Sequence, residues 1–322
     1  MPSGQSVLSV RDLTVDYGQH RALDKLNLDI TEGELVGVIG PNGAGKTSFV
    51  KALCGRLRLK GELKVRGKNL RRGTDRRQHI ALVPQDIGLY PHLTATENLH
   101  VIGRLLGLKN KQNIADALDA VEMTQHAILR ISEMSGGMKR RINVAAAILT
   151  KPSLVIFDEP TAGVDAPARD TVHRLARKLA NEGKAVILIT HELEQAEALC
   201  DKVLVLCKGK PLAFETPARL LEQSFQDQRE VMVRYAVPPR QDSFAAMRPF
   251  KFKQGELPTI WVALTKANEV SFVSAFLTAL RGQDDLIREI SVRRPGLNAL
   301  MHRIEKTGHL SCLLYTSPSP RD

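Results

Sequence analysis

Hydrophobic and polar positions along the chain predict strands and helices that alternate. Short apolar runs of strand type occur at four places, namely 34–39, 80–83, 154–157 and 185–189. Apolar residues at helical spacing cover 48–54, 94–149 and 169–180. Strands that alternate with helices are typical of a largely parallel sheet with helical crossovers. The sequence therefore predicts an α/β fold for most of the chain.

Both ends of the chain have a different pattern. Alternating apolar residues from Ser6 to Tyr17 and from Leu26 to Ile30 predict strands near the N-terminus. Beyond residue 222 the sequence predicts a small α+β region, with strands and helices at 231–235, 260–264, 268–280, 286–292 and 296–304. We expect one domain over 1–221 and a small α+β C-terminal domain over 222–308, in which no catalytic constellation is visible.

Composition adds bounds to this picture. The chain has 322 residues, is 43% hydrophobic and 25% charged, and carries a formal net charge of +11. Its basic clusters are spread along the chain, which fits solvated faces or proximity to an acidic membrane surface. No apolar run approaches the roughly 20 residues of a membrane span, and the N-terminus lacks a signal pattern. We therefore expect a cytosolic protein with reduced cysteines.

The last residues, 309–322, stand apart from the rest. They include the segment CLLYTSPSPRD, which has no periodicity. This segment resembles the translation of a sequencing adapter read in frame, and a native disordered Ser/Pro-rich tail is the alternative. The expectation is a non-native tail that plays no part in the fold.

The most informative segment is GPNGAGKT at residues 40–47, which fits the phosphate-binding pattern G-x-x-x-x-G-K-[ST]. A strand-type run precedes it and a helical run follows it, so a nest of backbone N–H groups would lie at a helix N-terminus. Lys46 would reach the β- and γ-phosphates, and the Thr47 hydroxyl would ligate Mg²⁺. Nucleotide binding is the working hypothesis.

A second segment carries two carboxylates at the end of a buried strand. Asp158 and Glu159 follow the apolar run 154–157, and strands of a parallel sheet present their carboxyl ends to the ligand. Asp158 would hold Mg²⁺, and Glu159 would orient and deprotonate the attacking water. A pair of helix-capping acids before Pro160 is the alternative.

Several weaker signals have plain structural alternatives. Ser135-Gly136-Gly137 at a helix start is a possible second anion site, but Ser is also a common N-cap. Gln85 and His191 each follow a strand and could face the γ-phosphate, although an exposed Gln and a structural His are common. Tyr17 could stack on adenine, or it could be an edge aromatic.

In this order the segments resemble the nucleotide-binding subunit of an ATP-binding cassette (ABC) transporter, over about residues 6–220. The resemblance implies a P-loop NTPase fold with an antiparallel β subdomain and a helical signature subdomain at about 92–150. It identifies Gln85 with the Q-loop, Asp165 with the D-loop and His191 with the switch histidine. The signature, usually LSGGQ, reads here from Met134 to Met138, which puts a side-chain hydrogen bond from Met138 in doubt.

The resemblance assigns every candidate site residue. The residues expected to bind ATP are Tyr17, Gly40, Pro41, Asn42, Gly43, Ala44, Gly45, Lys46, Thr47 and Ser48. Those expected to contact the ATP of a partner subunit are Ser135, Gly136, Gly137 and Met138. Those expected to act in catalysis are Glu159, His191, Gln85 and Lys46, and those expected to bind Mg²⁺ are Thr47, Gln85 and Asp158.

A mechanism follows from the resemblance. Two ATPase subunits, identical or different, would sandwich ATP head to tail and drive a separate membrane permease. The segment from Pro84 to Leu99 resembles the ATPases of multidrug, antibiotic or polysaccharide exporters, which implies export and a place at the cytoplasmic face of the bacterial inner membrane. The rival hypotheses are a cassette ATPase that acts on nucleic acid or ribosomes, and a regulatory module without turnover. Two fused cassettes or a long coiled coil would favour the first rival, and neither is visible, so no nucleic acid is expected as a partner.

Overall fold

The computed structural model describes residues 5–70, 73–161, 165–240, 243–244, 247–255, 257–266, 268–280 and 287–307. They form two compact units, one from residues up to 217 together with the end of the last helix, and one from 218 to 303. The expected domain boundary at 221/222 falls inside helix α8 (Pro217–Phe225). The tail expected at 309–322 lies outside the described residues.

The larger unit is built on a six-stranded sheet in the order β10-β9-β3-β8-β7-β6. Its strands are β3 (Leu35–Ile39), β6 (Ile80–Val83), β7 (Leu154–Asp158), β8 (Ala185–Ile189), β9 (Lys202–Cys207) and β10 (Lys210–Glu215). All neighbours pair in parallel except β10, which is antiparallel to β9. Strands β3 and β8 are buried at every position, as expected for the centre of a sheet that is covered on both faces.

A second sheet of this unit is antiparallel, in the order β2-β1-β4-β5. Its strands are β1 (Ser6–Tyr17), β2 (His20–Thr31), β4 (Lys60–Val65) and β5 (Lys68–Asn69). Apolar side chains of this sheet, of the central sheet and of helix α1 (Lys46–Leu53) share one hydrophobic core. Phe49 of α1 is fully buried in that core. The helix that follows the phosphate loop is thus fixed between two sheets.

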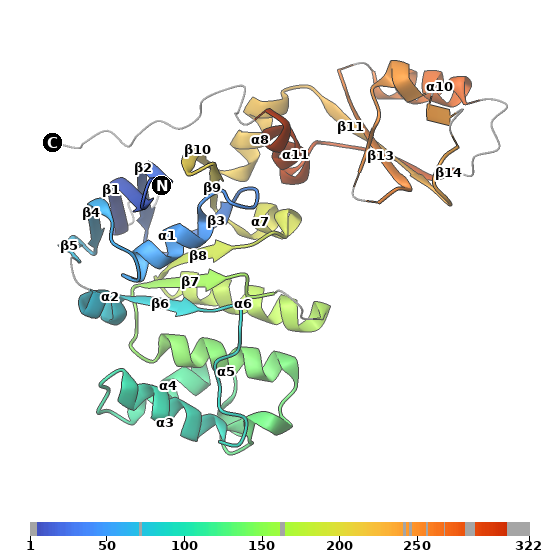
Figure 1. The fold of residues 1–322 in the computed structure, drawn as a ribbon. Helices are drawn as coiled ribbons and strands as arrows, with labels where there is room; N and C mark the ends of the chain where they lie inside the picture. The colour runs from blue at the N-terminus through green and yellow to red at the C-terminus, as the bar shows by residue number, and fades with distance from the viewer. Residues whose placement is uncertain are drawn as a thin grey trace. The chain divides into compact units, whose positions relative to one another are not determined.

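Helices complete the larger unit. They are α2 (Gly73–His79), α3 (Ala95–Leu105), α4 (Gln112–Ala120), α5 (Gly136–Ile148), α6 (Ala166–Asn181) and α7 (Leu193–Leu199), with the 3-10 turns η1 (Thr124–His126) and η2 (Ile131–Glu133). Helices α3, α4 and α5 gather beside β6, at the end of the central sheet remote from the antiparallel sheet (Figure 1). Thr94 and Glu97 form a capping box that fixes the start of α3. These helices correspond to the region expected at 92–150.

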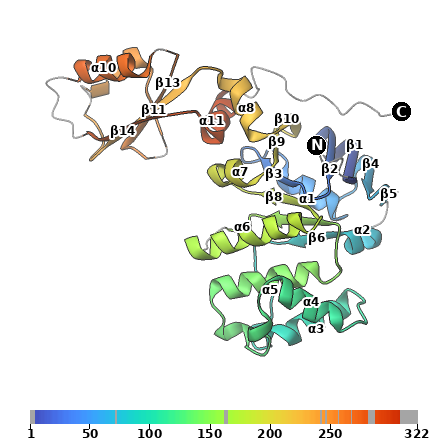
Figure 2. The same ribbon diagram turned by 180° about the vertical axis from the view of Figure 1, so that it is seen from behind.

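The smaller unit is an α+β fold with the sheet order β12-β13-β11-β14, seen from both sides in Figures 1 and 2. Its elements are β11 (Arg229–Tyr235), η3 (Arg248–Phe250), β12 (Lys253–Gln254), β13 (Ile260–Thr265), α10 (Glu269–Ala279) and β14 (Ile287–Arg293), with α8 and most of α11 (Leu297–Thr307). Val231, Val233 and Tyr235 of β11 pack with Phe276 of α10 in its own core.

The α/β fold expected from the sequence is confirmed, and most of its elements were foreseen. The strand expected at Leu26–Ile30 is longer, because its pairing with β1 continues to the turn between Tyr17 and His20. Strands β9 and β10 were not expected, although β9 is the inner neighbour of β3. Among the described residues, no helix combines the length and apolar character needed to cross a lipid bilayer.

Replacing Phe49 with alanine tests the shared core. We expect Phe49→Ala to lower the free energy of unfolding by about 3–5 kcal/mol, because it removes a buried aromatic ring and leaves a cavity. Chemical denaturation followed by circular dichroism measures the change. Lys51→Ala on the exposed side of the same helix is the control, with an expected effect within about 0.5 kcal/mol. Equal effects of the two substitutions would contradict the packing described here.

Candidate functional site

The phosphate-binding pattern forms the loop between β3 and α1, where the sequence placed it. Gly40 and Gly45 are required by close approach of the backbone. A Cβ atom on Gly40 would lie 2.3 Å from the carbonyl oxygen of Leu206, and one on Gly45, at φ 105°, would lie 2.6 Å from that of Ala22. The Ala44 N–H donates to the Pro41 carbonyl at 3.1 Å, which tightens the loop. The loop therefore wraps closely around the N-terminus of α1.

Lys46 is the first residue of α1, and its side chain turns back into the loop. Its Nζ donates to the carbonyl oxygens of Gly40 at 2.6 Å and Pro41 at 3.1 Å. Burial lowers the pKa of Lys46, while the charges of Glu159 and Asp158 act in the opposite direction. Thr47 beside it is exposed. A buried ammonium that bonds only neutral carbonyls gains a stronger partner when phosphate oxygens arrive.

The two carboxylates leave the end of β7 in different ways. Asp158 pairs with Ile189 at the last rung of the sheet. Glu159 adopts a left-handed conformation, φ 47°, which is strained for a residue with a side chain. Its N–H still donates to the Ile189 carbonyl at 3.0 Å. The chain thus turns sharply within one residue, and the two carboxylates separate.

Asp158 carries the signature of a crowded acidic site. Burial raises the pKa of Asp158, the charge of Glu159 raises it further, and Lys51 and Lys46 lower it. A carboxylate held in its charged form against such a cost is typical of functional sites. A bound cation would remove this cost, since it compensates both charges.

His191 faces Glu159. It lies two residues beyond β8, and its Nε2 is 2.7 Å from Glu159 Oε1. Both side chains keep solvent access, with exposed fractions of 50% and 28%. A carboxylate and an imidazole in direct contact form a proton-transfer pair, so the arrangement can activate a water molecule. Glu159 makes this contact from a left-handed backbone conformation.

Gln85 follows β6 and is exposed. Its backbone is held by Arg140 of α5, whose Nη1 donates to the carbonyl oxygens of Gln85 at 2.8 Å and Pro84 at 3.0 Å. Arg140 is almost fully buried, and burial lowers its pKa while Asp86 acts in the opposite direction. The sequence analysis missed this residue. The basic run Lys139-Arg140-Arg141 was visible, but only the fold turns its middle member inward.

Ser135 is the N-cap of α5, and its Oγ accepts a hydrogen bond from the Met138 N–H at 3.2 Å. A Cβ atom on Gly136 would meet nothing within 4 Å, and Ser135 is exposed. Ser135 therefore acts as an N-cap in this structure, which was the structural alternative to an anion site. It leaves the N–H groups of Gly136 and Gly137 at an exposed helix N-terminus, where anions bind.

Two further candidates lie at the edges of elements. Asp165 is the N-cap of α6, and its Oδ1 accepts from the Ala168 N–H at 3.0 Å. Tyr17 ends β1 opposite His20 and is 44% exposed, which leaves its ring free for a contact outside the sheet. The structure brings together Lys46, Asp158, Glu159 and His191, whereas Ser135 and Asp165 are the N-caps of α5 and α6. The individual roles stay predictions.

The candidate metal ligands are the Thr47 hydroxyl, the Asp158 carboxylate and the Gln85 amide. All three offer oxygen atoms, the donors that Mg²⁺ prefers, and a single carboxylate is usual where phosphates supply further ligands. Burial and the charge of Glu159 raise the pKa of Asp158, and the positive charge of Mg²⁺ would offset this cost. The residues present therefore fit Mg²⁺.

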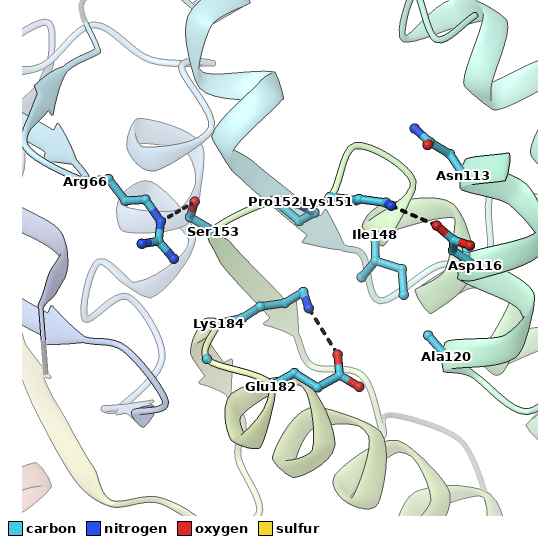
Figure 3. A pocket seen from close by; sticks show the side chains of 12 residues that line it. Arg66, Asn113, Asp116, Ala120, Ile148, Lys151, Pro152, Ser153, Glu182 and Lys184 are labelled. Carbon is cyan, nitrogen blue, oxygen red and sulfur yellow. Dashed lines mark hydrogen bonds and ion pairs between the residues drawn. The ribbon is translucent and has the colours of Figure 1, made fainter. Parts of the chain in front are cut away.

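Two cavities lie away from this site. One, of about 340 Å³, opens where β7 and β8 begin, at the opposite end of the sheet (Figure 3). Its cations already have acidic partners, Lys151 with Asp116 at 2.8 Å and Lys184 with Glu182 at 3.1 Å. The other, of about 420 Å³, is lined by residues of β6, α3 and α5. None of the candidate site residues lines either cavity.

Comparison with known proteins decides the family. The model of the ABC transporter family matches residues 23–162. The linearmycin resistance ATP-binding protein LnrL of Bacillus subtilis is 36% identical over 219 residues, which cover 66% of this chain and 70% of that protein. The chain belongs to the ABC transporter family. The Nod factor export ATP-binding protein I of Mesorhizobium japonicum is also 36% identical, over 69% of this chain and 68% of that protein.

Solved structures agree. An ATP-binding subunit of an ABC transporter superposes with a TM-score of 0.59 at 28% identity, over 67% of this chain and 92% of that one. CbiO1 of Clostridium perfringens superposes with a TM-score of 0.62 at 24% identity, over 68% and 92%. The chain is thus an ATP-binding, ATP-hydrolysing subunit of the ABC type. The comparisons give no support to action on nucleic acid.

The buried charge of Asp158 generates a prediction about stability. Because its folded pKa is raised, ionisation of Asp158 opposes folding, and this penalty grows as pH rises above the ordinary value of 3.8. We expect Asp158→Asn to raise the melting temperature of the nucleotide-free ABC ATPase at neutral pH. The gain should shrink as pH falls toward the carboxyl range.

Differential scanning calorimetry between pH 5 and 8 checks this expectation. Asp116→Asn is the control, because ion pairing with Lys151 lowers the pKa of that exposed carboxylate, and its loss brings no gain. A melting temperature that falls in Asp158→Asn at neutral pH would contradict the electrostatic description of the site.

Proposed function

We propose that the chain is the ATPase subunit of an export-type ABC transporter, and that Mg²⁺-dependent ATP hydrolysis at Glu159 drives its cycle. The observation that carries the proposal is the contact of Glu159 with His191 at the same sheet edge as the phosphate loop. Relatives named for linearmycin resistance and for Nod factor export support the direction of transport.

The residues divide the chemistry among them. The loop from Gly40 to Ser48 holds the phosphates through its N–H groups, and Lys46 exchanges two carbonyl partners for charged oxygens. Glu159 takes a proton from the attacking water, and His191 orients the water and the γ-phosphate. Thr47, Gln85 and Asp158 would hold Mg²⁺, which would supply positive charge to the phosphate oxygens. Tyr17 stacks on the adenine ring.

Pairing of two ATPase subunits completes the site. The exposed N-terminus of α5, with Ser135, Gly136, Gly137 and Met138, offers N–H groups to the γ-phosphate bound by the partner subunit. Asp165 at the start of α6 lies at the same interface. Moving an open pair to a closed one, from 1:99 to 99:1, takes about 5.5 kcal/mol, so each of two nucleotides supplies about half. Loss of the γ-phosphate then reopens the pair.

A membrane permease receives this motion. The cavity of about 420 Å³ lies next to the Gln85 segment, and its lining includes Leu82, Pro84, Ile102 of α3 and Leu106, the C-cap of α3. Tyr90 is 46% exposed and Ile87 partly exposed, whereas Leu89 between them is buried. Leu89 faces inward, because the side chain of Asn98 ties the neighbouring Tyr90 backbone to α3. Apolar residues of this lining, which also contains the polar Arg77 and Asn143, support docking of a permease segment here, and the subunit would then act at the cytoplasmic face of the membrane.

Glu159→Gln separates binding from hydrolysis. We expect turnover to fall by at least about 10²-fold, because the general base is lost while the side-chain shape is kept. ATP should then hold the subunits as a stable pair, which light scattering after gel filtration measures. Glu182→Gln on the same unit is the control and should leave turnover unchanged. A variant that hydrolyses ATP normally would refute the role of Glu159.

Leu106→Asp tests the permease surface. We expect it to reduce recovery of the ATPase with its permease from detergent extracts about tenfold or more, because a charge enters an apolar contact. ATP hydrolysis by the isolated subunit should not change. Ile128→Asp, at a residue 85% exposed outside this cavity, is the matched control. Equal recovery of Leu106→Asp and wild type would contradict docking at this cavity.

A further inference from the structure

Helices α6 and α7 both contact β3, and a cluster of polar side chains joins them. Arg169 and His173 lie one turn apart on α6, while Glu192 precedes α7 and Gln195 lies in its first turn. Arg169 Nε is 3.5 Å from Glu192 Oε1. His173 is only 6% exposed. We call these four residues the polar clamp.

Each residue of the polar clamp has one buried polar atom without a hydrogen-bond partner in the described part of the chain. These atoms are Arg169 Nε, His173 Nε2, Glu192 Oε2 and Gln195 Oε1. Most buried polar atoms in proteins are hydrogen-bonded, and each one left alone costs about 1–3 kcal/mol. Three such atoms, beside an Arg169 Nε that has only an ion-pair contact with Glu192, therefore make a feature that packing alone does not account for.

The chemistry of the four atoms is complementary. Arg169 Nε is a donor, Glu192 Oε2 and Gln195 Oε1 are acceptors, and the His173 ring can do either. Burial lowers the pKa of His173, and the positive charge of Arg169 lowers it further. The negative charges of Glu192 and Asp170 act in the opposite direction. Pairing these donors with these acceptors would require a change in the position of the side chains or of α7. Such a rearrangement would add hydrogen bonds to those described here.

The polar clamp includes the residue next in sequence to His191, which is proposed to act in hydrolysis. Glu192 is the residue directly after His191, and its N–H donates to Thr190 Oγ1 at 2.9 Å. His191 in turn contacts Glu159 at 2.7 Å. Any change in how Glu192 is held on α6 therefore moves the backbone that carries His191. An imidazole displaced by about 1 Å can cost about 10²-fold in rate.

We propose that Arg169, His173, Glu192 and Gln195 are positioning residues, which fix His191 against Glu159 by closing their hydrogen bonds when the site is engaged. The inference rests on the proposed role of His191 in hydrolysis. It assigns to α6 a part in catalysis that none of the sequence motifs marks. None of the four touches the reacting atoms, and they act through His191.

His173→Leu is the decisive variant. Leucine fills a similar volume and has no polar atom to leave alone, so the melting temperature should be equal to or above that of wild type. We expect kcat to fall about tenfold while KM for ATP stays within about twofold, the pattern of a group that acts only in the transition state. A merely structural residue would lower the melting temperature instead.

Two companions keep the test specific. Arg169→Lys retains the charge at a shorter reach and should recover part of the rate that Arg169→Met loses. Arg174→Gln, on the exposed side of the same helix, is the matched control and should leave kcat unchanged.

A double substitution shows whether the effect passes through His191. In a His191→Ala background, assayed by release of radiolabelled phosphate, His173→Leu should cause no further loss, because coupled residues are not additive. An unchanged rate in His191→Ala alone would refute the proposed role of His191 itself. Two outcomes would overturn the polar clamp alone, provided that His191→Ala lowers the rate of hydrolysis. One is an unchanged rate in His173→Leu. The other is a further tenfold loss of rate in the double variant.

Discussion

The parallel register of the central sheet is the constraint on which the site depends. Val38 of β3, Ile189 of β8 and Asp158 of β7 lie on one rung, so the segments that follow these strands leave the sheet at the same level. The phosphate loop thereby meets Glu159 and His191, which lie more than a hundred positions further along the chain. A shift of one strand by one residue would reverse the side chains on both faces, and complete burial of β3 and β8 forbids it.

Within that frame, the site holds charge that burial makes unfavourable. Lys46 is buried on carbonyl oxygens, Asp158 is partly desolvated beside Glu159, and Glu159 itself adopts a strained backbone. Each feature costs stability in the empty protein and is relieved by a phosphate, a cation or a proton transfer. The same logic extends to the polar clamp, where unpaired polar atoms are tolerated beside the segment that carries His191. Strain and unpaired charge mark where we expect the ABC ATPase to change during the proposed cycle.

Polar contacts connect α5 to the rest of the larger unit, and the proposed opening and closing of the subunit pair would be transmitted through them. Arg140 holds the backbone at Gln85, so the helix that begins at Ser135 is tied to the segment beside the proposed permease cavity. Asp165 begins α6, and α6 carries half of the polar clamp. The helices that would meet a second subunit are thus linked by buried polar contacts to the groups that would cleave ATP.

The sequence by itself determined the phosphate loop, the strand that ends in Asp158 and Glu159, and most helices and strands of the larger unit. These features are local: they depend on a glycine pattern, a run of apolar residues or a helical period, all read from consecutive positions. Strands β9 and β10 were missed because short apolar runs near helices are ambiguous without their neighbours. Only the tertiary structure decided the inward turn of Arg140, the contact of His191 with Glu159 and the cluster at His173. Those depend on which strands are adjacent and which helix face is covered, and contacts over long sequence separation follow from packing and not from local pattern.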